Sequence, residues 1–416
     1  MHVKLLANSV WFAVDVRAHC PADSSVPPMT SNVAPSSGRN AGIDLLRGVS
    51  ILLVVMNHIG LRIPLHRTAL GELLPAWLLK ALIYNGLSAV YVFFVVSGFL
   101  IARNALARWG SLGAVHLRDF YVRRFARIVP LLTLLIAVLA VLHAVGAHDY
   151  VIHRPGQSLI GAVASAFGLY LNVYEAHTGY LPGNWDVLWS LSIEEVFYLA
   201  FPLLCLLLRR RRAMVPLLVL LAVSLPYTRG LAEGNEIWME KAYLPGMSAI
   251  ACGVLGALLA ARWQPSLTVA RTMIASGALV LTGLLLRGDL LWPYLGHGVM
   301  LLLVLSTAVL VLGLHARAAA SPAPRPLPGF GWLRVCGRLS YEIYLTHMFV
   351  VYAAVDLYRA TGKPLATGFL WYPPILLLTA ALGAVVARWV SQPCERALRA
   401  RWLQRRGVVS GKRVEA

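Results

Sequence analysis

The chain has 416 residues, of which 58% are hydrophobic and only 13% are charged. Soluble domains usually carry about 25% charged residues, so this composition excludes a water-soluble fold and indicates a polytopic membrane protein. The formal net charge of +19 does not predict a nucleic-acid partner, because the basic residues lie in short clusters between apolar segments.

Residues 1–40 differ from the rest of the chain. The stretch Pro21–Asn40 is rich in Ser, Pro and Asn, and such composition is typical of a disordered tail. A cleaved signal peptide over Leu5–Val16 is the alternative, although Asp15 interrupts this apolar run and few positive charges precede it. We predict a disordered N-terminal tail and assign no function to it.

Ten apolar segments are predicted to cross a bilayer, whose hydrocarbon core is about 30 Å thick. With the N-terminus inside, the inner segments carry about three times as many Arg and Lys as the outer ones, as the positive-inside rule requires. We therefore predict an all-α polytopic membrane protein with both termini cytoplasmic. The predicted spans are 43–62, 86–102, 124–145, 190–208, 213–228, 244–261, 272–287, 291–313, 340–357 and 372–390.

The segment Ser158–Asn172 is apolar but short for a full span. It lies in a long outer loop, about residues 146–189. We predict a re-entrant or interfacial helix here, because an eleventh span would reverse the orientation of every later helix.

The first predicted helix carries Arg47 and His58. They are eleven residues apart, which is about three turns and about 16 Å along one helix face. A charged side chain within a bilayer is expensive and marks a functional site. With the predicted orientation, Arg47 lies near the cytoplasmic boundary and His58 lies beyond the midplane. The alternatives are a snorkelling anchor for Arg47 and a structural histidine bonded to a neighbouring helix for His58.

Three arginines, Arg123, Arg124 and Arg127, stand at the inner end of the third predicted helix. Arginine binds phosphate groups through two parallel hydrogen bonds. This cluster therefore predicts a site for a phosphorylated donor such as an acyl coenzyme A. The alternative is simple positive-inside anchoring.

Two further blocks lie at other helix boundaries. Ser97 and Gly98 close the second helix, where close packing through small residues is the alternative to a site role. The block Trp189–Tyr198 contains adjacent carboxylates, Glu194 and Glu195, at an apolar boundary. They point about 100° apart on a helix, so at most one is expected to face the site, where it could orient a histidine or shift its pKa. Interfacial placement with a tryptophan belt is the alternative. The other candidates in this block are Trp189, Ser192 and Tyr198.

The block Leu339–His347 contains Tyr341 and a second intramembrane histidine, His347, whose role the sequence leaves open. The remaining histidines have no spacing typical of a metal site, and we predict no metal.

Together these blocks resemble the acyltransferase family 3 membrane proteins, which O-acylate bacterial surface polysaccharides and some secondary metabolites. The resemblance covers about residues 40–397, and the blocks occur in the family's order. The chain departs from the family at Gln392–Glu395, where the family often has Glu-Pro or Glu-Arg-Pro. The matching blocks are Arg-x10-His (Arg47, His58), Phe-Phe-x-x-Ser-Gly-Phe, Arg-Arg-x-x-Arg-x-x-Pro, Trp-Ser-Leu-Ser-x-Glu-x-x-Phe-Tyr and Ser-Tyr-x-x-Tyr-Leu-x-His.

The resemblance implies transfer of an acyl group, acetyl above all, from cytoplasmic acyl-CoA to a hydroxyl of a carbohydrate or secondary-metabolite acceptor. It implies a bacterial inner-membrane enzyme in contact with membrane lipid, with acyl-CoA as donor substrate and no permanently bound cofactor. The expected domains are the tail 1–40, a transmembrane acyltransferase domain 41–397 and a basic cytoplasmic tail 398–416. The oligomeric state stays open.

In this scheme Arg123, Arg124 and Arg127 bind the coenzyme A phosphates and Arg47 orients the thioester. His58 is either a general base or a transient acyl carrier, and Glu194 orients or charge-balances His58 or an arginine. One alternative function is a glycolipid or polysaccharide-precursor transporter or flippase. Another is the second large family of membrane-bound O-acyltransferases, against which the early Arg-x10-His argues.

Overall fold

In the computed structural model, residues 39–208, 211–320 and 329–411 are described, and all regular elements among them are helices. The chain divides into two compact units, Met1–Arg39 and Asn40–Ala416. All the helices of the described residues belong to the second unit. Nearly all of the predicted tail 1–40 lies outside the described residues.

Eight helical stretches in the described part are long and apolar enough to cross a membrane, which confirms the all-α polytopic class. They match eight of the ten predicted spans. The other two predicted spans, 213–228 and 340–357, correspond to the shorter helices α10 (Arg211–Val223) and α11 (Leu225–Gly230) and to α18 (Ser340–Ala360), so the number ten stays a prediction. The eight stretches contain α1 (Ala41–Gly60), α4 (Gly86–Trp109), α5 (Leu117–Ala144), α8 with α9 (Gly183–Asp186, Trp189–Leu207), α12 with α13 (Glu236–Lys241, Tyr243–Ala260), α14 (Leu267–Arg287), α16 (Gly298–Ala320) and the run η5, α19, η6 and the first part of α20 (Leu365–Trp371, Tyr372–Val386, Ala387–Ser391, Gln392–Gly411).

Local sequence signals explain where several helices begin and end. The Asn40 side chain accepts hydrogen bonds from the backbone N–H groups of Gly42 and Ile43, at 3.0 and 3.2 Å, and so caps α1. The predicted single helix over 158–172 is instead two short ones, α6 (Leu159–Phe167) and α7 (Leu171–Thr178). Leu169 between them has a φ of 61°, a backbone conformation that no α-helix contains.

The span predicted at 291–313 begins later than expected. A short helix α15 (Trp292–Leu295) comes first, and Gly296, with a φ of 48°, separates it from α16. Glycine tolerates this left-handed conformation without a steric penalty, which is why the apolar run breaks here.

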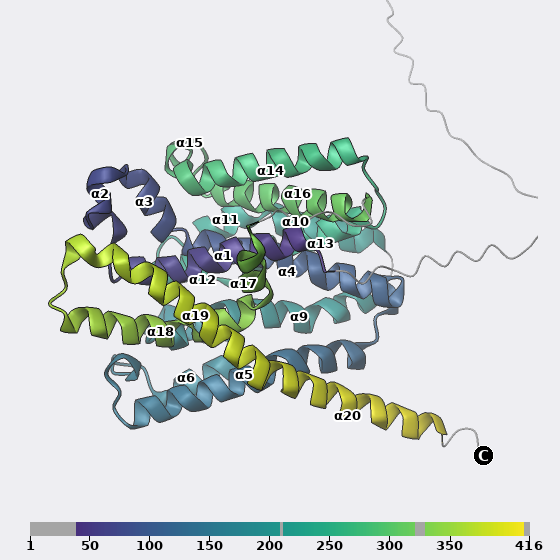
Figure 1. Cartoon of the computed structure of the whole chain (residues 1–416). Coiled ribbons are helices and arrows are strands. Elements are labelled where there is room, and N and C mark those ends of the chain that lie inside the picture. The colour runs from purple at the N-terminus through teal and green to yellow at the C-terminus, as the bar shows by residue number, and fades with distance from the viewer. Residues whose placement is uncertain (1–38, 209–210, 321–328, 412–416) are drawn as a thin grey trace, which may run out of the picture. The chain divides into compact units, whose positions relative to one another are not determined.

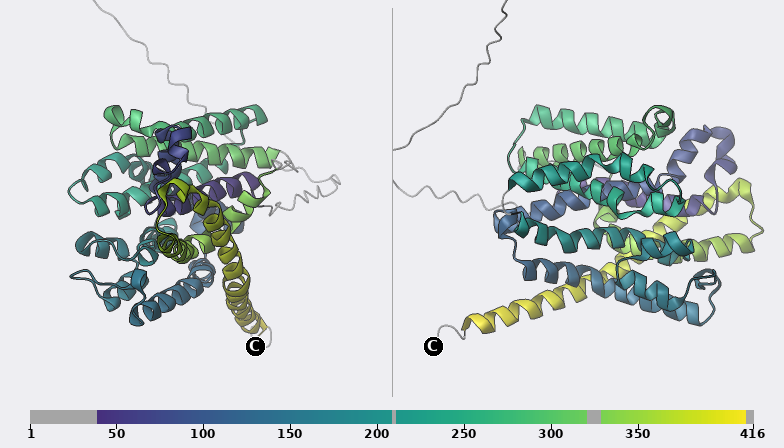
Figure 2. Two further views of the ribbon diagram at one scale, coloured as in Figure 1. Left: turned by 60° about the vertical axis from the view of Figure 1, so that its left-hand side comes forward. Right: turned by 180° about the vertical axis from the view of Figure 1, so that it is seen from behind.

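The long helices run side by side in the second unit (Figures 1 and 2). The pair α14 and α16 lies on one side and α5 with α6 on the other, while α1, α4, α13 and α9 lie between them. Helices α4 and α13 pack backbone to backbone, since a Cβ added at Gly98 or at Gly253 would lie 2.0 Å from a carbonyl oxygen of the opposite helix. Gly98 is therefore a packing residue, as in the alternative given for its block.

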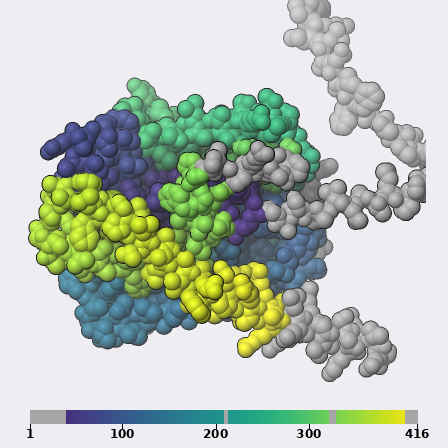
Figure 3. Space-filling model, in the orientation of Figure 1, coloured from purple at the N-terminus to yellow at the C-terminus, as the bar shows by residue number. Residues whose placement is uncertain are grey.

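Two helices from the C-terminal part of the chain lie on one face of the unit (Figure 3). Helix α17 (Gly331–Arg338) packs on the start of α1 so closely that a Cβ at Gly337 would lie 1.8 Å from the Asp44 carbonyl oxygen. Helix α20 crosses α5, where Trp402 Nε1 donates to Asp119 Oδ1 at 3.1 Å and Arg118 stacks on the Trp402 ring at 4.1 Å. The predicted basic tail 398–416 thus begins as a packed helix, and its last residues, 412–416, lie outside the described part.

Candidate functional site

Helix α1 carries Arg47 and His58, as the sequence predicts. Their separation of eleven residues places them about 16 Å apart along the helix axis. We call the end of the bundle where α1 begins the Arg47 end, and the end where α1 finishes the His58 end. Each residue belongs to a different group of polar side chains.

At the Arg47 end, the guanidinium of Arg47 is held by α18. Its Nη2 donates to Ser340 Oγ at 2.7 Å, across 293 residues of sequence. Two carboxylates, those of Glu194 and Glu342, lie within electrostatic reach of it. Arg47 is therefore part of an ionic group drawn from three helices, which is more than a lipid-facing anchor would need.

Arg124 and Arg127 join this group from α5. The Arg124 guanidinium lies over the Tyr198 ring, 3.9 Å from its centroid, and both arginines are within electrostatic reach of Glu194 and Glu195. We call Arg47, Arg124 and Arg127 with Glu194, Glu195 and Glu342 the arginine cluster.

The two adjacent carboxylates of α9 differ in their surroundings. Both approach Arg124 and Arg127, but Glu194 also reaches Arg47 and lies beside Ser97. Ser97 Oγ in turn hydrogen-bonds the hydroxyl of Tyr198. Of the two kinds of partner predicted for Glu194, the arginines lie within its electrostatic reach; a role toward His58 stays a prediction.

The His58 end contains a pair of imidazoles. The ring centroids of His58 on α1 and His347 on α18 are 5.0 Å apart, with an interplanar angle of 48°. Arg62 donates from Nη1 to the His58 carbonyl oxygen at 2.8 Å and lies over the Tyr352 ring at 4.8 Å. The sequence named both histidines, but only the fold places them together.

The imidazole of His347 is fully buried, with an exposed fraction of 0%. Its Nδ1 lies 2.7 Å from the Tyr344 carbonyl oxygen and 3.2 Å from that of Ile343. Its Nε2 has no hydrogen-bond partner among the described residues. Nδ1 therefore anchors the ring to the backbone of α18, while Nε2 makes no hydrogen bond to a described residue.

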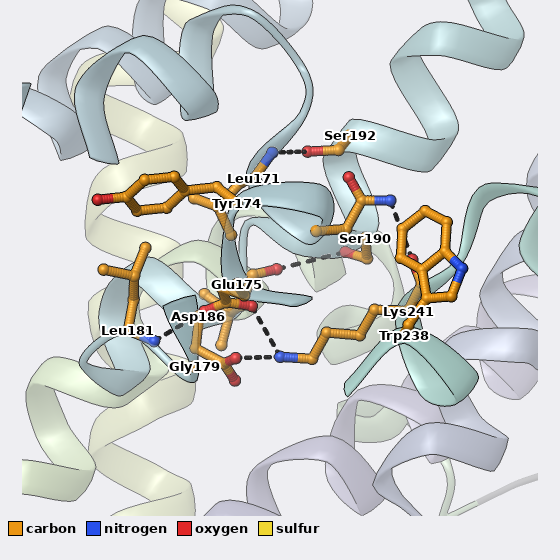
Figure 4. Close-up of polar contacts among 12 residues, drawn as sticks. Leu171, Tyr174, Glu175, Gly179, Leu181, Asp186, Ser190, Ser192, Trp238 and Lys241 are labelled. Carbon is orange, nitrogen blue, oxygen red and sulfur yellow. Dashed lines mark hydrogen bonds and ion pairs between the residues drawn. The ribbon is translucent and has the colours of Figure 1, made fainter. Parts of the chain in front are cut away.

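A buried ionic triad near His58 escaped the sequence analysis. Lys241 Nζ donates to Glu175 Oε2 at 2.9 Å and also to Asp186 Oδ1, and Leu181 N donates to Glu175 Oε1 at 3.0 Å (Figure 4). The side chains of Lys241 and Glu175 are 3% and 0% exposed. Lys241 lies within electrostatic reach of His58. The triad thus ties α7, α8 and α12 together beside the imidazole pair.

The carboxyl group of Glu175 is the titratable group of the triad that burial affects most clearly. Burial and the neighbouring Asp186 carboxylate raise the pKa of Glu175 well above its ordinary value, although Lys241 opposes this shift. The sequence signal for this residue is an acidic side chain three positions after the apolar segment 158–172.

Three other predicted candidates make structural contacts. Trp189 packs edge-on against Phe94 at 6.1 Å. Ser192 Oγ accepts a hydrogen bond from Leu171 N at 3.3 Å, and the Tyr341 hydroxyl donates to the Ile128 carbonyl oxygen at 3.0 Å. These contacts join α9 to α4 and α7, and α18 to α5. They therefore position the helices that carry the arginine cluster and the imidazole pair.

The described residues contain no group of three His, Cys, Asp or Glu side chains arranged to hold a metal ion.

Comparison with known proteins adds the family. A region of 165 residues is 30% identical to the peptidoglycan O-acetyltransferase OatA of Listeria monocytogenes and covers 39% of this chain and 25% of that protein. The O-acetyltransferase OatA of Staphylococcus aureus is 24% identical over 385 residues, which cover 85% of this chain and 57% of the relative. A putative O-acetyltransferase of S. aureus is 27% identical over 168 residues, 39% of this chain and 24% of the relative. The chain thus spans from about a quarter to little more than half the length of these relatives.

No solved structure matches the chain. The family model described as an acyltransferase domain matches residues 40–389, a region that holds both the arginine cluster and the imidazole pair. The chain therefore belongs to the acyltransferase 3 family of multi-pass membrane proteins.

Proposed function

We propose that this protein is a membrane O-acetyltransferase that moves an acetyl group from acetyl-CoA to a hydroxyl of a carbohydrate acceptor. One observation carries the proposal. A single helix, α1, contributes a guanidinium to a phosphate-binding type of cluster at one end and an imidazole to a histidine pair at the other.

The arginine cluster suits the phosphate groups of the donor. Guanidinium groups bind phosphate oxygens bidentately and remain charged at all accessible pH values. The facing carboxylates, Glu194 above all, keep Arg47, Arg124 and Arg127 oriented while the site is empty. A coenzyme A donor bound there by its phosphates extends its flexible arm toward the His58 end.

The imidazole pair suits the acyl-transfer step. Imidazole acts as a general base or as an acyl carrier near neutral pH, and the two rings lie side by side, 5.0 Å apart. With the Arg47 end cytoplasmic, as the distribution of positive charges favours, donor and acceptor approach from opposite sides.

The surroundings of the pair suit a polyhydroxylated acceptor. Asn184 lies on α8, which packs on α18, and its fully buried amide has no hydrogen-bond partner for either polar atom among the described residues. Buried amides without partners are costly, and sugar hydroxyls both donate and accept. The relatives named as O-acetyltransferases, one of them acting on peptidoglycan, support a glycan as the acceptor class.

The test uses membranes that contain the full-length protein, labelled acetyl-CoA, and release of alkali-labile acetate from envelope glycans. Arg47→Ala and His58→Ala should each lower transfer by about 10²-fold or more, the scale of a lost catalytic proton-transfer group. The matched controls are Arg108→Ala and His153→Ala, whose side chains lie near the same helix ends but outside both groups. Normal transfer by both site variants contradicts the proposal, and so does movement of a lipid-linked sugar without acetylation, which a flippase would give.

A further inference from the structure

The hydrogen bonds of His347 determine which of its nitrogens carries a proton. Nδ1 faces two backbone carbonyl oxygens, those of Tyr344 at 2.7 Å and Ile343 at 3.2 Å. Carbonyl oxygens only accept hydrogen bonds, so Nδ1 must be the N–H donor. In the neutral imidazole Nε2 then has the free lone pair.

The nitrogen that carries this lone pair is buried. The His347 side chain is 0% exposed, and Nε2 has no partner among the described residues. A buried polar atom without a partner costs about 1–3 kcal/mol. The ring of His58 is the neighbouring imidazole, with centroids 5.0 Å apart, so a group bound at His58 lies next to the His347 ring.

The other polar groups near the His58–His347 pair already make hydrogen bonds or ion pairs. The Tyr344 hydroxyl donates to the Val187 carbonyl oxygen and accepts from Ser190. Lys241 holds the carboxylates of Glu175 and Asp186. Arg62, on the turn after α1, is bound to the His58 carbonyl oxygen and has no basic nitrogen. His347 Nε2 is therefore the base that this set of groups leaves open.

We propose, resting on the proposed function, that the two histidines divide the reaction, with His58 receiving the acetyl group and His347 Nε2 taking the proton of the acceptor hydroxyl. In the first step a ring nitrogen of His58 attacks the thioester carbonyl carbon. The C–S bond breaks and coenzyme A leaves as the thiolate.

In the second step the acceptor oxygen attacks the same carbonyl carbon. Its O–H proton passes to His347 Nε2, the C–N bond breaks, and the electron pair returns to His58. The proton on His347 is finally released and balances the one that the coenzyme A thiolate takes up. The Nδ1–H bond to Tyr344 stabilises the imidazolium that forms in between.

The test compares acceptors that need a base with one that does not. The purified full-length protein in lipid nanodiscs receives acetyl-CoA with chitotetraose, with water alone, or with hydroxylamine, whose neutral nitrogen attacks without prior proton removal. Coenzyme A release and acetylated product are both measured. The key variant is His347→Asn, because its amide nitrogen can keep the bond to the Tyr344 carbonyl while nothing replaces Nε2.

His347→Asn should lower transfer to chitotetraose and to water by about 10²–10⁴-fold and leave transfer to hydroxylamine within a few-fold of wild type. His58→Asn should abolish transfer to all three acceptors. Equal loss of hydroxyl and hydroxylamine transfer in His347→Asn overturns the base role and assigns the residue to packing, and retention of hydroxyl transfer also overturns it. A wild-type protein that releases coenzyme A with none of the acceptors overturns the proposed function itself, a result distinguishable from the loss of one acceptor class.

Discussion

Replacing Lys241 with methionine should destabilise the protein more than any single surface change. Methionine has a similar length but leaves the carboxylates of Glu175 and Asp186 facing each other without the ammonium that both contact. Removing one partner of a buried ion pair costs about 3–5 kcal/mol when the remaining charge stays buried, which holds above the raised pKa of Glu175, where its carboxyl group is ionised. The cost arises mainly at Glu175, because its side chain is 0% exposed, whereas that of Asp186 is 18% exposed and can be hydrated.

The matched control is the double variant Lys241→Met with Glu175→Gln. It keeps the shape of the triad but removes the uncompensated buried charge, and replacing both members of a buried pair is often close to neutral. We therefore expect the double variant to recover most of the stability that the single variant loses. The loss in the single variant should also shrink toward acidic pH, where Glu175 can be protonated.

The assay is the denaturant or thermal unfolding of the purified protein in detergent, followed by tryptophan fluorescence. A loss below about 1 kcal/mol for Lys241→Met, within the range of an exposed ion pair, would refute the reasoning. So would a double variant no more stable than the single one, because the cost would then come from packing of the lysine stem and not from the stranded carboxylate.

Three further predictions concern packing, donor binding and pH. Gly253→Ala should lower the free energy of unfolding by at least about 1–3 kcal/mol, the usual range for overpacking, because the new Cβ would lie 2.0 Å from a carbonyl oxygen of α4. Gly256→Ala on the same helix is the control, since its Cβ meets only an ordinary contact at 3.5 Å. The melting temperature of the Gly253 variant should therefore be the lower of the two. Arg124→Ala should raise KM for acetyl-CoA by about tenfold or more, the scale of a lost hydrogen bond to a charged group, with Arg108→Ala as the control, and equal KM values in steady-state assays would contradict the donor site. The pKa of Glu175 is raised, so the folded state binds the carboxyl proton more tightly than the unfolded chain does. The resulting stability is complete below the ordinary carboxyl pKa of about 4.3 and is lost as pH rises through the raised pKa. Glu175→Gln should flatten this fall in melting temperature with pH, and an unchanged pH dependence would argue against the raised pKa.

The sequence predicted the helices well because hydrophobic length is a local property. It also placed Arg47 and His58 on one face of one helix, since helical spacing alone determines that relation. It failed where a single residue breaks an apolar run, as Leu169 and Gly296 do. Their positive φ angles depend on how the flanking helices pack, which composition does not record.

Relations between helices were the part that the sequence could not predict. Glu194 had two possible kinds of partner, and the packing of α9 against α5 places it near arginines. His347 was a histidine without an argued role until α18 set it 5.0 Å from His58. The triad of Lys241, Glu175 and Asp186 joins segments that sequence reading treated as separate outer loops.

The bond between Arg47 and Ser340 spans 293 residues of sequence, and the imidazole pair likewise joins the first long helix to α18. Ribosomal synthesis and membrane insertion proceed from the N-terminus. The nascent chain must therefore hold α1 in the membrane, with Arg47 and His58 still lacking their α18 neighbours, until the 293 residues that separate Arg47 from Ser340 have been translated. Chains that stop before α18 lack both contacts, so on the proposed function an interrupted translation product cannot transfer acetyl groups.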